Sequence, residues 1–224
     1  VRVGCPESLH DILEVKLTES LTVSLPEVRK RRCLSLRAMG MLRETARNAD
    51  AVAIGPGLGI HRETSELVRR FVGEYEGKIV IDADAINAFA GQAELLLRAP
   101  GEKVLTPHSG ELSRLTGTAA SDIMADPVAA ARSASRDTGA VVLLKGPNTV
   151  IAEPSGRVWL NGSGTSDLAT AGAGDVLTGI IAGLMAQGLS ASDAAVPGAY
   201  LHGLCGERAS SRLGGSGVLA GDLP

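Results

Sequence analysis

Aromatic residues are the scarcest group in this chain of 224 residues. One tryptophan, two tyrosines and two phenylalanines make up only 2% of the sequence. Proteins that bind single-stranded nucleic acids rely on stacking against aromatic side chains. The 22 basic and 25 acidic residues give a net charge of −3, so there is also no excess of positive charge for a phosphate backbone. The composition therefore argues against a nucleic-acid partner.

Cysteines are few as well, and long apolar runs are missing. Cys5, Cys33 and Cys205 are far apart and odd in number, and no Cys-x-x-Cys motif or Cys/His cluster is present. This argues against a disulfide framework or a structural zinc site, so we expect a cytoplasmic protein. Apolar segments end well short of the roughly 18 residues that cross a bilayer, and no signal peptide is visible. No membrane partner is expected.

The length of the chain suits one large α/β domain, so we expect a single domain over residues 1–224. The chain begins with Val1 rather than methionine, directly in a predicted strand, VRVGCP. We therefore expect the sequence to lack its natural N-terminal segment. At the other end, GGSG over 214–217 predicts a loosely ordered terminus.

Short apolar runs alternate with helical segments along most of the chain. Such runs end at Gly55, Asp82, Thr106 and Gly146, and each is typical of a strand buried in a parallel sheet. TVIAEPSGRVWLNG, from Thr149, then predicts an antiparallel hairpin around a Pro-Ser-Gly turn. The pattern predicts a three-layer α/β/α sandwich with a central, mostly parallel sheet and an antiparallel hairpin at its edge.

A glycine-rich loop runs without a break into an apolar helix between 161 and 188. Gly172 and Gly174 can adopt positive φ, and the small Ala173 between them keeps side chains away from the backbone N–H groups. The helix that follows adds the positive end of its dipole, so Gly172, Ala173 and Gly174 are predicted to form an anion hole. Asp175 at its mouth would repel a phosphate, which favours a proton-accepting role over that of a plain N-cap.

Polar motifs follow the other predicted strands, where ligands bind in parallel sheets. GPGLG over 55–59 is a poor match to a dinucleotide fingerprint and predicts either a close backbone approach to a ligand or a plain turn. Asp82, Asp84 and Asn87 form a polar cluster, with Asp84 either a helix N-cap or a residue facing a ligand or hydrated magnesium. His108 stands in a loop just past a strand end, which favours a functional histidine.

The segment Lys145–Thr149 also follows a strand. A lysine with nearby backbone amides can bind a nucleotide's phosphates or ribose, although a solvated lysine before a Gly-Pro turn is the plainer alternative. The Walker pattern GxxxxGK[ST] is absent, so any nucleotide must bind by another scheme.

Taken together, GPGLG, DADAIN, LTPHSGE, LLKGPNT and ATAGAGDVLTGIIAGLMAQG resemble, in order and spacing, the bacterial NAD(P)H-hydrate dehydratases of the ribokinase-like superfamily. The match extends from Gly55 to Ala209. The resemblance implies a lyase that repairs hydrated NADH or NADPH. ADP, or ATP in eukaryotic relatives, phosphorylates the hydroxyl at C6 of the reduced ring, and phosphate is then eliminated.

The resemblance also implies roles for individual residues. Gly57, His108 and Asp175 would contact the hydrated cofactor, and Asp175 would act as the catalytic base on its hydroxyl. The phosphates imply Mg²⁺, without any metal ligand assigned to the protein, and relatives imply a homo-oligomer such as a tetramer. The adenine nucleotide would be bound by Lys145, Gly146, Pro147, Asn148, Thr149 and Gly174.

The sequence departs from the family pattern in three respects. Ala171-Gly-Ala-Gly-Asp175 replaces the common Gly-Gly-Thr-Gly-Asp, which removes a hydroxyl donor and keeps the backbone hole. The Gly- and Ala-rich stretch that family members carry nearer the N-terminus, with its substrate contact, is absent, as is the epimerase domain fused to some relatives.

Two alternatives stay open at this point. The first is another ribokinase-like small-molecule kinase, such as a hydroxymethylpyrimidine or hydroxyethylthiazole kinase. The second is a nucleotide-binding sensor or inactive relative, against which the presence of Asp175 argues. The choice between ADP and ATP, and between the two hydrated cofactors, is also open.

Overall fold

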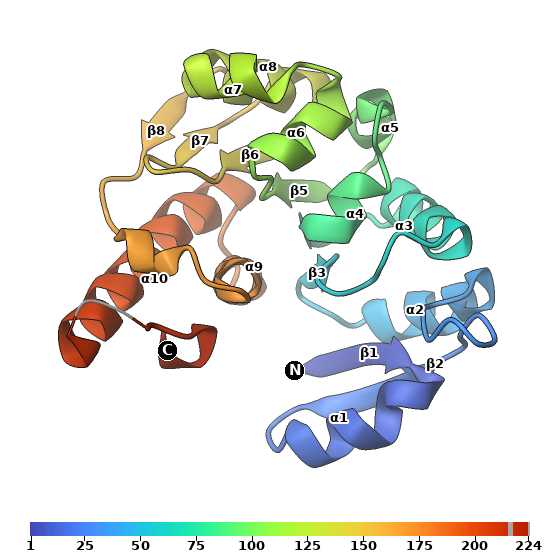
Figure 1. The fold of residues 1–224 in the computed structure, drawn as a ribbon. Helices are drawn as coiled ribbons and strands as arrows, with labels where there is room; N and C mark the ends of the chain where they lie inside the picture. Colours follow the sequence, from blue (N-terminus) through green and yellow to red (C-terminus); the bar gives the residue numbers. More distant parts are fainter. Residues whose placement is uncertain (215–216, 224) are drawn as a thin grey trace.

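A six-stranded sheet forms the centre of the molecule (Figure 1). The structure, a computed structural model, describes residues 1–214 and 217–223. The first four strands are parallel, and the last two are antiparallel and form the edge hairpin. This confirms the predicted sheet. In spatial order the strands are β3 (Val52–Ile54), β4 (Lys78–Ile81), β5 (Glu102–Leu105), β6 (Val141–Leu144), β7 (Val150–Ala152) and β8 (Val158–Leu160).

The central strands are apolar on both sides because a helical layer covers each face of the sheet. Along a strand, successive side chains point to opposite faces. Val80, Val104 and Leu143 therefore join one apolar cluster, while Ile81 and Leu105 join the other. All five are fully buried, and burying a side chain of this size contributes about 1.5–3 kcal/mol.

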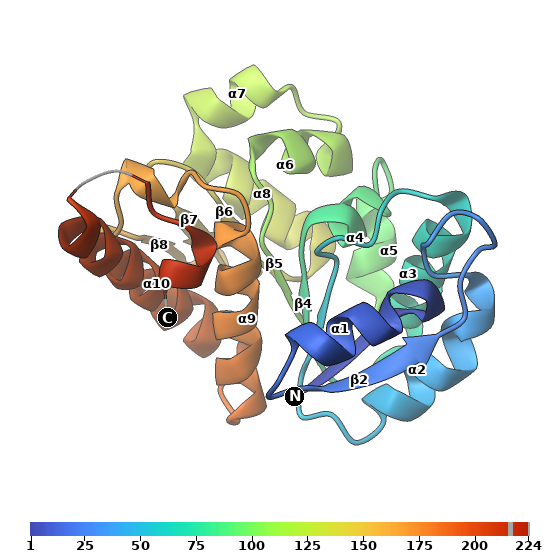
Figure 2. The same cartoon turned by 60° about the horizontal axis from the view of Figure 1, so that its bottom comes forward.

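The two helical layers are visible in Figure 2. Helices α9 (Ala173–Ala186) and α10 (Ala191–Leu213) pack on one face, with Ile181 and Met185 of α9 buried there. The other face is covered by α3 (Arg62–Glu74), α5 (Ala93–Arg98) and α8 (Pro127–Thr138). The result is the predicted three-layer α/β/α sandwich.

The first part of the chain forms a small sheet of its own. β1 (Arg2–Pro6) and β2 (Leu21–Leu25) run parallel, joined through a 3-10 turn (Glu7–Leu9) and α1 (His10–Lys16). In the described part of the chain, this pair is not hydrogen-bonded to the six-stranded sheet. A 3-10 turn (Leu36–Ala38) and α2 (Met39–Ala46) then lead to β3. That all these elements form one domain stays a prediction.

The remaining helices are short. α4 (Ala83–Asn87) follows β4, α6 (Ser109–Thr116) follows β5, and α7 (Ala120–Ala125) leads to α8. Two 3-10 turns, Ser166–Leu168 and Ala220–Asp222, flank α9 and α10 in sequence. No helix in the described ranges is long and apolar enough to cross a membrane.

The end of the chain is partly packed. Val218 and Leu223 are buried in a small cluster with Ala173 and Ala209, at the start of α9 and late in α10. Residues 215–216, within the predicted loosely ordered terminus, lie outside the described residues. Because Val218 and Leu223 are buried, the segment 218–223 is packed against the rest of the molecule.

Candidate active site

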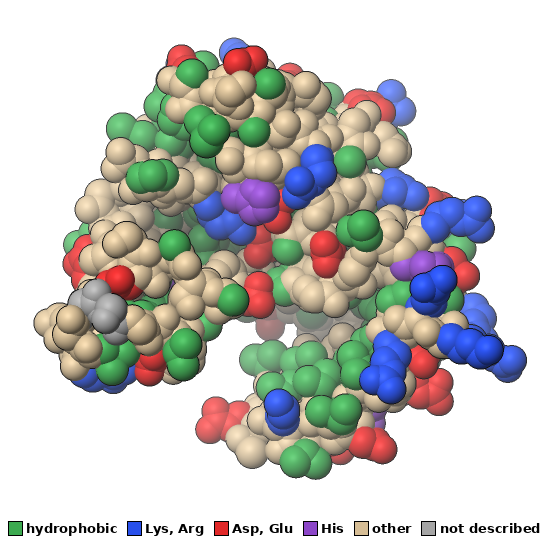
Figure 3. All heavy atoms as spheres, in the orientation of Figure 1, with side chains coloured by type: hydrophobic (Ala, Val, Ile, Leu, Met, Phe, Trp, Pro, Cys, Tyr) green, Lys and Arg blue, Asp and Glu red, His purple; other side chains and the backbone are tan. Residues whose placement is uncertain are grey.

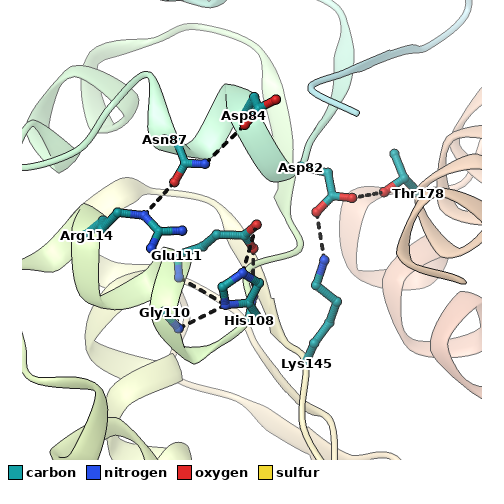
Figure 4. Close-up of polar contacts among 9 residues, drawn as sticks. All are labelled: Asp82, Asp84, Asn87, His108, Gly110, Glu111, Arg114, Lys145 and Thr178. Carbon is teal, nitrogen blue, oxygen red and sulfur yellow. Dashed lines mark hydrogen bonds and ion pairs between the residues drawn. The ribbon is translucent and has the colours of Figure 1, made fainter. Parts of the chain in front are cut away.

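The polar motifs of the sequence meet at the carboxyl ends of the parallel strands. The loops after β3, β4, β5 and β6 and the first turn of α9 converge there, because parallel strands all end at the same edge of the sheet. In Figure 3, acidic, basic and histidine side chains gather at the centre of this face, beside a hollow in the surface. Figure 4 shows nine of the residues concerned.

Asp82, the first residue after β4, is the most buried polar group of this site, with 1% of its surface exposed. Its backbone N–H donates to the Ile54 carbonyl across the sheet, at 3.0 Å. Gly55 fits against it so closely that a Cβ at position 55 would lie 1.7 Å from the Asp82 carbonyl oxygen. The ends of β3 and β4 are therefore in close contact at Asp82.

The side chain of Asp82 joins β4 to β6 and α9. Its Oδ1 accepts a hydrogen bond from Lys145 Nζ at 2.9 Å, and its Oδ2 accepts one from Thr178 Oγ1 at 2.8 Å (Figure 4). Thr178 is buried, whereas the Lys145 side chain keeps 24% of its surface exposed. A Cβ at Gly174 would lie 3.4 Å from Lys145 Nζ, so the ammonium group lies against the first turn of α9.

Of the two glycines expected to allow positive φ in the predicted anion hole, only Gly172 has it, and Gly174 is helical. Gly172 has φ +86° and α9 begins at Ala173. Among the described residues, no acceptor is found for the N–H groups of Gly172 and Gly174, while Ala173 N donates to Thr170 O at 3.3 Å. The helix N-terminus therefore keeps donors available for an anion.

Asp175 lies in this first turn and is exposed at the open side of the site. The surrounding protein still removes part of its water, which raises its pKa above the ordinary value for aspartate. The negative charge of Asp82 raises this pKa further, and the positive charge of Lys145 opposes both effects. An aspartate with a raised pKa is a stronger base when ionised, as a proton-accepting role requires.

His108 is the N-cap of α6, a role that the sequence did not reveal. Its Nδ1 accepts hydrogen bonds from the backbone N–H groups of Gly110 and Glu111, at 3.0 and 3.2 Å. The carboxylate of Glu111 accepts in return from the His108 backbone N–H and lies 3.2 Å from Nε2, completing a capping box. Half of the His108 side chain is nevertheless exposed, so the ring is available to a ligand.

A second chain of polar contacts links the loop after β3 to α4 and α6. Asp84 accepts from Gly59 N–H at 2.8 Å and from the Asn87 amide at 3.4 Å, and Asn87 in turn accepts from Arg114 Nε at 2.8 Å (Figure 4). Asp84 is therefore not the N-cap of α4, which was one of its two predicted roles. The N-cap position belongs to Asp82, whose side chain caps nothing because it turns to Lys145 and Thr178.

The remaining predicted residues lie in exposed turns. Gly57 has φ +68° with open space around its Cα, as a loop that approaches a ligand would need. Residues 146–148 are exposed between β6 and β7, and Thr149 Oγ1 donates to the Gly146 carbonyl at 3.4 Å. The tertiary structure thus brings Lys145, Gly174 and Asp175 together, while the roles of the predicted nucleotide and substrate contacts stay predictions.

Three polar residues of this site were not singled out from the sequence: Thr178, Glu111 and Arg114. Thr178 lies one helical turn after Gly174, and Glu111 is at the N3 position where capping boxes carry an acidic residue. These two spacings could have identified Thr178 and Glu111 from the sequence. The bond from Arg114 to Asn87 had no such signal, because it joins two helices, α6 and α4, that are separate in sequence.

The side chains of this site suit a magnesium ion that is bound mainly by nucleotide phosphates better than one bound only by protein ligands. In the described ranges no three histidine, cysteine, aspartate or glutamate side chains gather as metal ligands. Asp82 and Asp84 already accept two hydrogen bonds each. Magnesium commonly reaches such sites bound to substrate phosphates and water, with one or two carboxylates at most.

A sheet with this order, a glycine loop opening a helix, and an aspartate in its first turn define a ribokinase-like protein. A hydroxyethylthiazole kinase from Pyrococcus horikoshii shares this fold with a TM-score of 0.68, at 18% identity and over 99% of this chain and 85% of its own. At that identity only the fold is comparable. A family model described as NAD(P)H-hydrate dehydratase matches residues 1–223, and the chain belongs to that family.

Two relatives carry names consistent with this family. A bifunctional NAD(P)H-hydrate repair enzyme of Moorella thermoacetica is 45% identical over 223 residues, covering 100% of this chain and 42% of its own length. An ADP-dependent (S)-NAD(P)H-hydrate dehydratase of Neisseria meningitidis is 41% identical over 178 residues, covering 78% of this chain and 60% of its own. The chain thus spans about two fifths to three fifths of the length of these two relatives.

A solved structure agrees with them. The ADP/ATP-dependent NAD(P)H-hydrate dehydratase of Bacillus subtilis, co-crystallised with ATP and Mg²⁺, superposes with a TM-score of 0.78 at 28% identity. The comparison covers 99% of this chain and 76% of that one.

Proposed function

We propose that this protein removes water from hydrated NADH or NADPH, using ADP as the phosphoryl donor. The observation that carries the proposal is that Asp175, Lys145 and the N–H groups of Gly172 and Gly174 lie together at the start of α9. These two N–H groups have no acceptor among the described residues. The N–H groups and the ammonium would stabilise a transferring phosphoryl group, and Asp175 would take the proton of the attacking hydroxyl. The ADP dependence printed for the Neisseria relative supports the choice of donor.

The proposed reaction has two steps. The C6 hydroxyl oxygen forms a bond to the terminal phosphorus as the bond to the leaving nucleotide breaks, and the hydroxyl proton passes to Asp175. The C6–O bond then breaks with its electron pair on phosphate, while C5 loses a proton to water and the double bond between C5 and C6 is restored. The overall reaction is that of a carbon–oxygen lyase. Magnesium, when bound, would neutralise charge on the nucleotide's phosphates.

The other contacts follow from their positions in the site. Lys145, Gly146, Pro147, Asn148, Thr149 and Gly174 would bind the adenine nucleotide. Gly57 and the exposed ring of His108 would meet the hydrated nicotinamide. We further propose a homo-oligomer, specifically a tetramer, whose mass light scattering would measure. The three free cysteines support a reducing compartment such as the cytoplasm.

The test is the growth of the reduced-nicotinamide absorbance band. The protein is mixed with hydrated NADH or hydrated NADPH, Mg²⁺ and either ADP or ATP, and we expect the band to grow with ADP. Growth with ATP alone would correct the donor. No growth with either nucleotide, alongside demonstrated nucleotide binding, would contradict the dehydratase proposal and favour a kinase for small alcohols.

Two substitutions can separate the capping role of His108 from its proposed contact with the substrate. His108→Ala should lower the free energy of unfolding by about 1 kcal/mol, because the N-cap of α6 is lost. His108→Asn should retain most of this stability, since asparagine is a good N-cap. If the ring contacts the substrate, both variants should raise KM for hydrated NADH alike.

Urea denaturation and steady-state kinetics on the two variants check this prediction. A KM that rises only in the less stable alanine variant would show that His108 acts on the substrate solely by supporting α6.

A further inference from the structure

The conformation of the backbone at Asp82 is costly. Ala83, which follows it, has φ +49°, a left-handed conformation that side-chain-bearing residues seldom adopt. Gly55 has φ +135° and leaves no room for a side chain against the Asp82 carbonyl. Such conformations persist where the surroundings over-determine them, and they cluster at functional sites. Here, the conformations of Gly55 and Ala83 accompany an Asp82 carboxylate that points away from α4, the helix that follows it.

The carboxylate is aimed at Lys145 rather than at bulk water. Asp82 is 1% exposed and its two oxygens are used by Lys145 Nζ, at 2.9 Å, and Thr178 Oγ1, at 2.8 Å. A buried ion pair of this kind generally adds little net stability, because both charges lose water. Stability alone therefore does not account for the strained backbone that keeps the pair in place.

Asp82 holds the Lys145 side chain at the start of α9. Its ammonium lies 3.4 Å from the Cβ position of Gly174, beside the N–H groups that begin α9. A long lysine side chain would otherwise sample many rotamers at the end of β6. Bound to Asp82, the ammonium instead has one position, next to the point where an anion would bind.

We propose that Asp82 is a positioning residue, which holds the Lys145 ammonium beside the anion hole so that it contacts the phosphoryl group during transfer. This rests on the proposed function and deepens it, because it gives Lys145 a role in the transfer step beyond nucleotide binding. Thr178 fixes the second carboxylate oxygen, so the carboxylate cannot rotate away from Lys145.

Three variants test the coupling: Asp82→Asn, Lys145→Met and the double variant. Misplacing a catalytic group by about 1 Å can cost about 10²-fold in rate, so Asp82→Asn should lower kcat by about that factor with a smaller change in KM. Lys145→Met should lower kcat by about 10²–10³-fold. The double variant should be no slower than Lys145→Met, because Asp82 acts through Lys145.

Glu66→Gln is the matched control. It removes a carboxylate that pairs with Arg69 and Arg70 on the surface of α3, and it should leave kcat unchanged. Lys145→Met leaves Asp82 buried and unpaired, so its melting temperature should be the lowest of the three site variants. The double variant restores folding if that single variant fails to fold.

The pKa of Asp175 supplies a readout that a purely structural role would not move. The charged groups that face it are Asp82, from the end of β4, and Lys145, from the end of β6. From α10, His202 lies near Ala173, and burial lowers its pKa, which keeps it neutral near pH 7. Lys145→Met should raise the pKa of Asp175. Asp82→Asn removes the Asp82 charge and also releases the opposing ammonium, so it should lower this pKa less in the wild-type background than in the Lys145→Met background.

This pKa can be measured without substrate. Carbon-13 NMR of labelled aspartate carboxyls, with Asp175 assigned through Asp175→Asn, follows the titration in each variant. The acid limb of the kcat/KM profile should move with this pKa in each variant. The proposal is overturned if Asp82→Asn shifts the pKa of Asp175 equally in the wild-type and the Lys145→Met backgrounds, or if the double variant is slower than Lys145→Met. A wild-type protein that forms no NADH contradicts the proposed function instead, and the NMR titration still decides the placement of Lys145.

Discussion

Asp175→Asn is expected to lower kcat for NADH formation by about 10²–10⁴-fold, the usual contribution of a general base. Asparagine has nearly the same shape and keeps the first turn of α9, but it cannot accept the proton of the C6 hydroxyl. ADP affinity should be unchanged, because the N–H groups of the anion hole belong to the backbone. Single-turnover absorbance and calorimetric titration with ADP measure the two quantities. A variant that turns over near the wild-type rate would rule out the general-base role.

The same substitution should not destabilise the protein near pH 7. Partial burial, and then Asp82, raise the pKa of Asp175 against the opposing charge of Lys145. A carboxyl with a raised pKa binds its proton more tightly in the folded state, so its contribution to stability is lost as the pH rises through that pKa. Asparagine is uncharged and avoids this loss. Asp175→Asn should therefore melt at or above the wild-type temperature near neutral pH, and the difference should vanish below the ordinary pKa of aspartate.

Gly55→Ala is expected to have the largest effect on stability, on the order of 3 kcal/mol or more. Its Cβ would lie 1.7 Å from the Asp82 carbonyl oxygen and 3.1 Å from the Ala85 Cβ, in a backbone conformation with φ +135°. The contact is with backbone, so no side-chain rotation can relieve it. The ends of β3 and β4 must separate, which also moves Asp82 and with it Lys145. Activity should fall together with the urea midpoint.

Gly117→Ala is the control for this prediction. Gly117 ends α6 with φ +77°, but no atom lies within 4 Å of its Cβ position. Only the conformational penalty remains, about 1–2 kcal/mol. If Gly55→Ala costs no more than Gly117→Ala, the close approach of Gly55 to Asp82 is not important for stability.

Several parts of the fold and the site follow from local sequence. The apolar runs that end at Gly55, Asp82, Thr106 and Gly146 became the parallel strands, because a strand buried on both faces must be apolar at every position. The Pro-Ser-Gly turn marked the β7–β8 hairpin, and the glycines before Asp175 marked a helix opened by a positive-φ residue. The family resemblance was confirmed by a match over residues 1–223.

The local sequence was ambiguous where a residue type can either cap a helix or contact a ligand. A histidine past a strand end predicted function, and only the hydrogen bonds of its Nδ1 showed that it also caps α6. Two aspartates at the start of α4 were equivalent in sequence, yet Asp84 bonds to Gly59 and Asn87 while Asp82 turns into the protein. The choice depends on φ at Ala83, which no pattern of residue types specifies.

The sequence by itself determined the alternation of strands and helices and the aspartate in the helix that the positive-φ Gly172 opens, since each depends on residues close together in the chain. Only the tertiary structure decided the Asp82–Lys145–Thr178 network, whose members are 63 and 96 residues apart. Contacts at that separation depend on strand order and register. The position of Lys145 beside the first turn of α9 therefore arises from the packing of β4, β6 and α9. The raised pKa of Asp175, which follows from burial and from Asp82 against the opposing charge of Lys145, arises from the same packing.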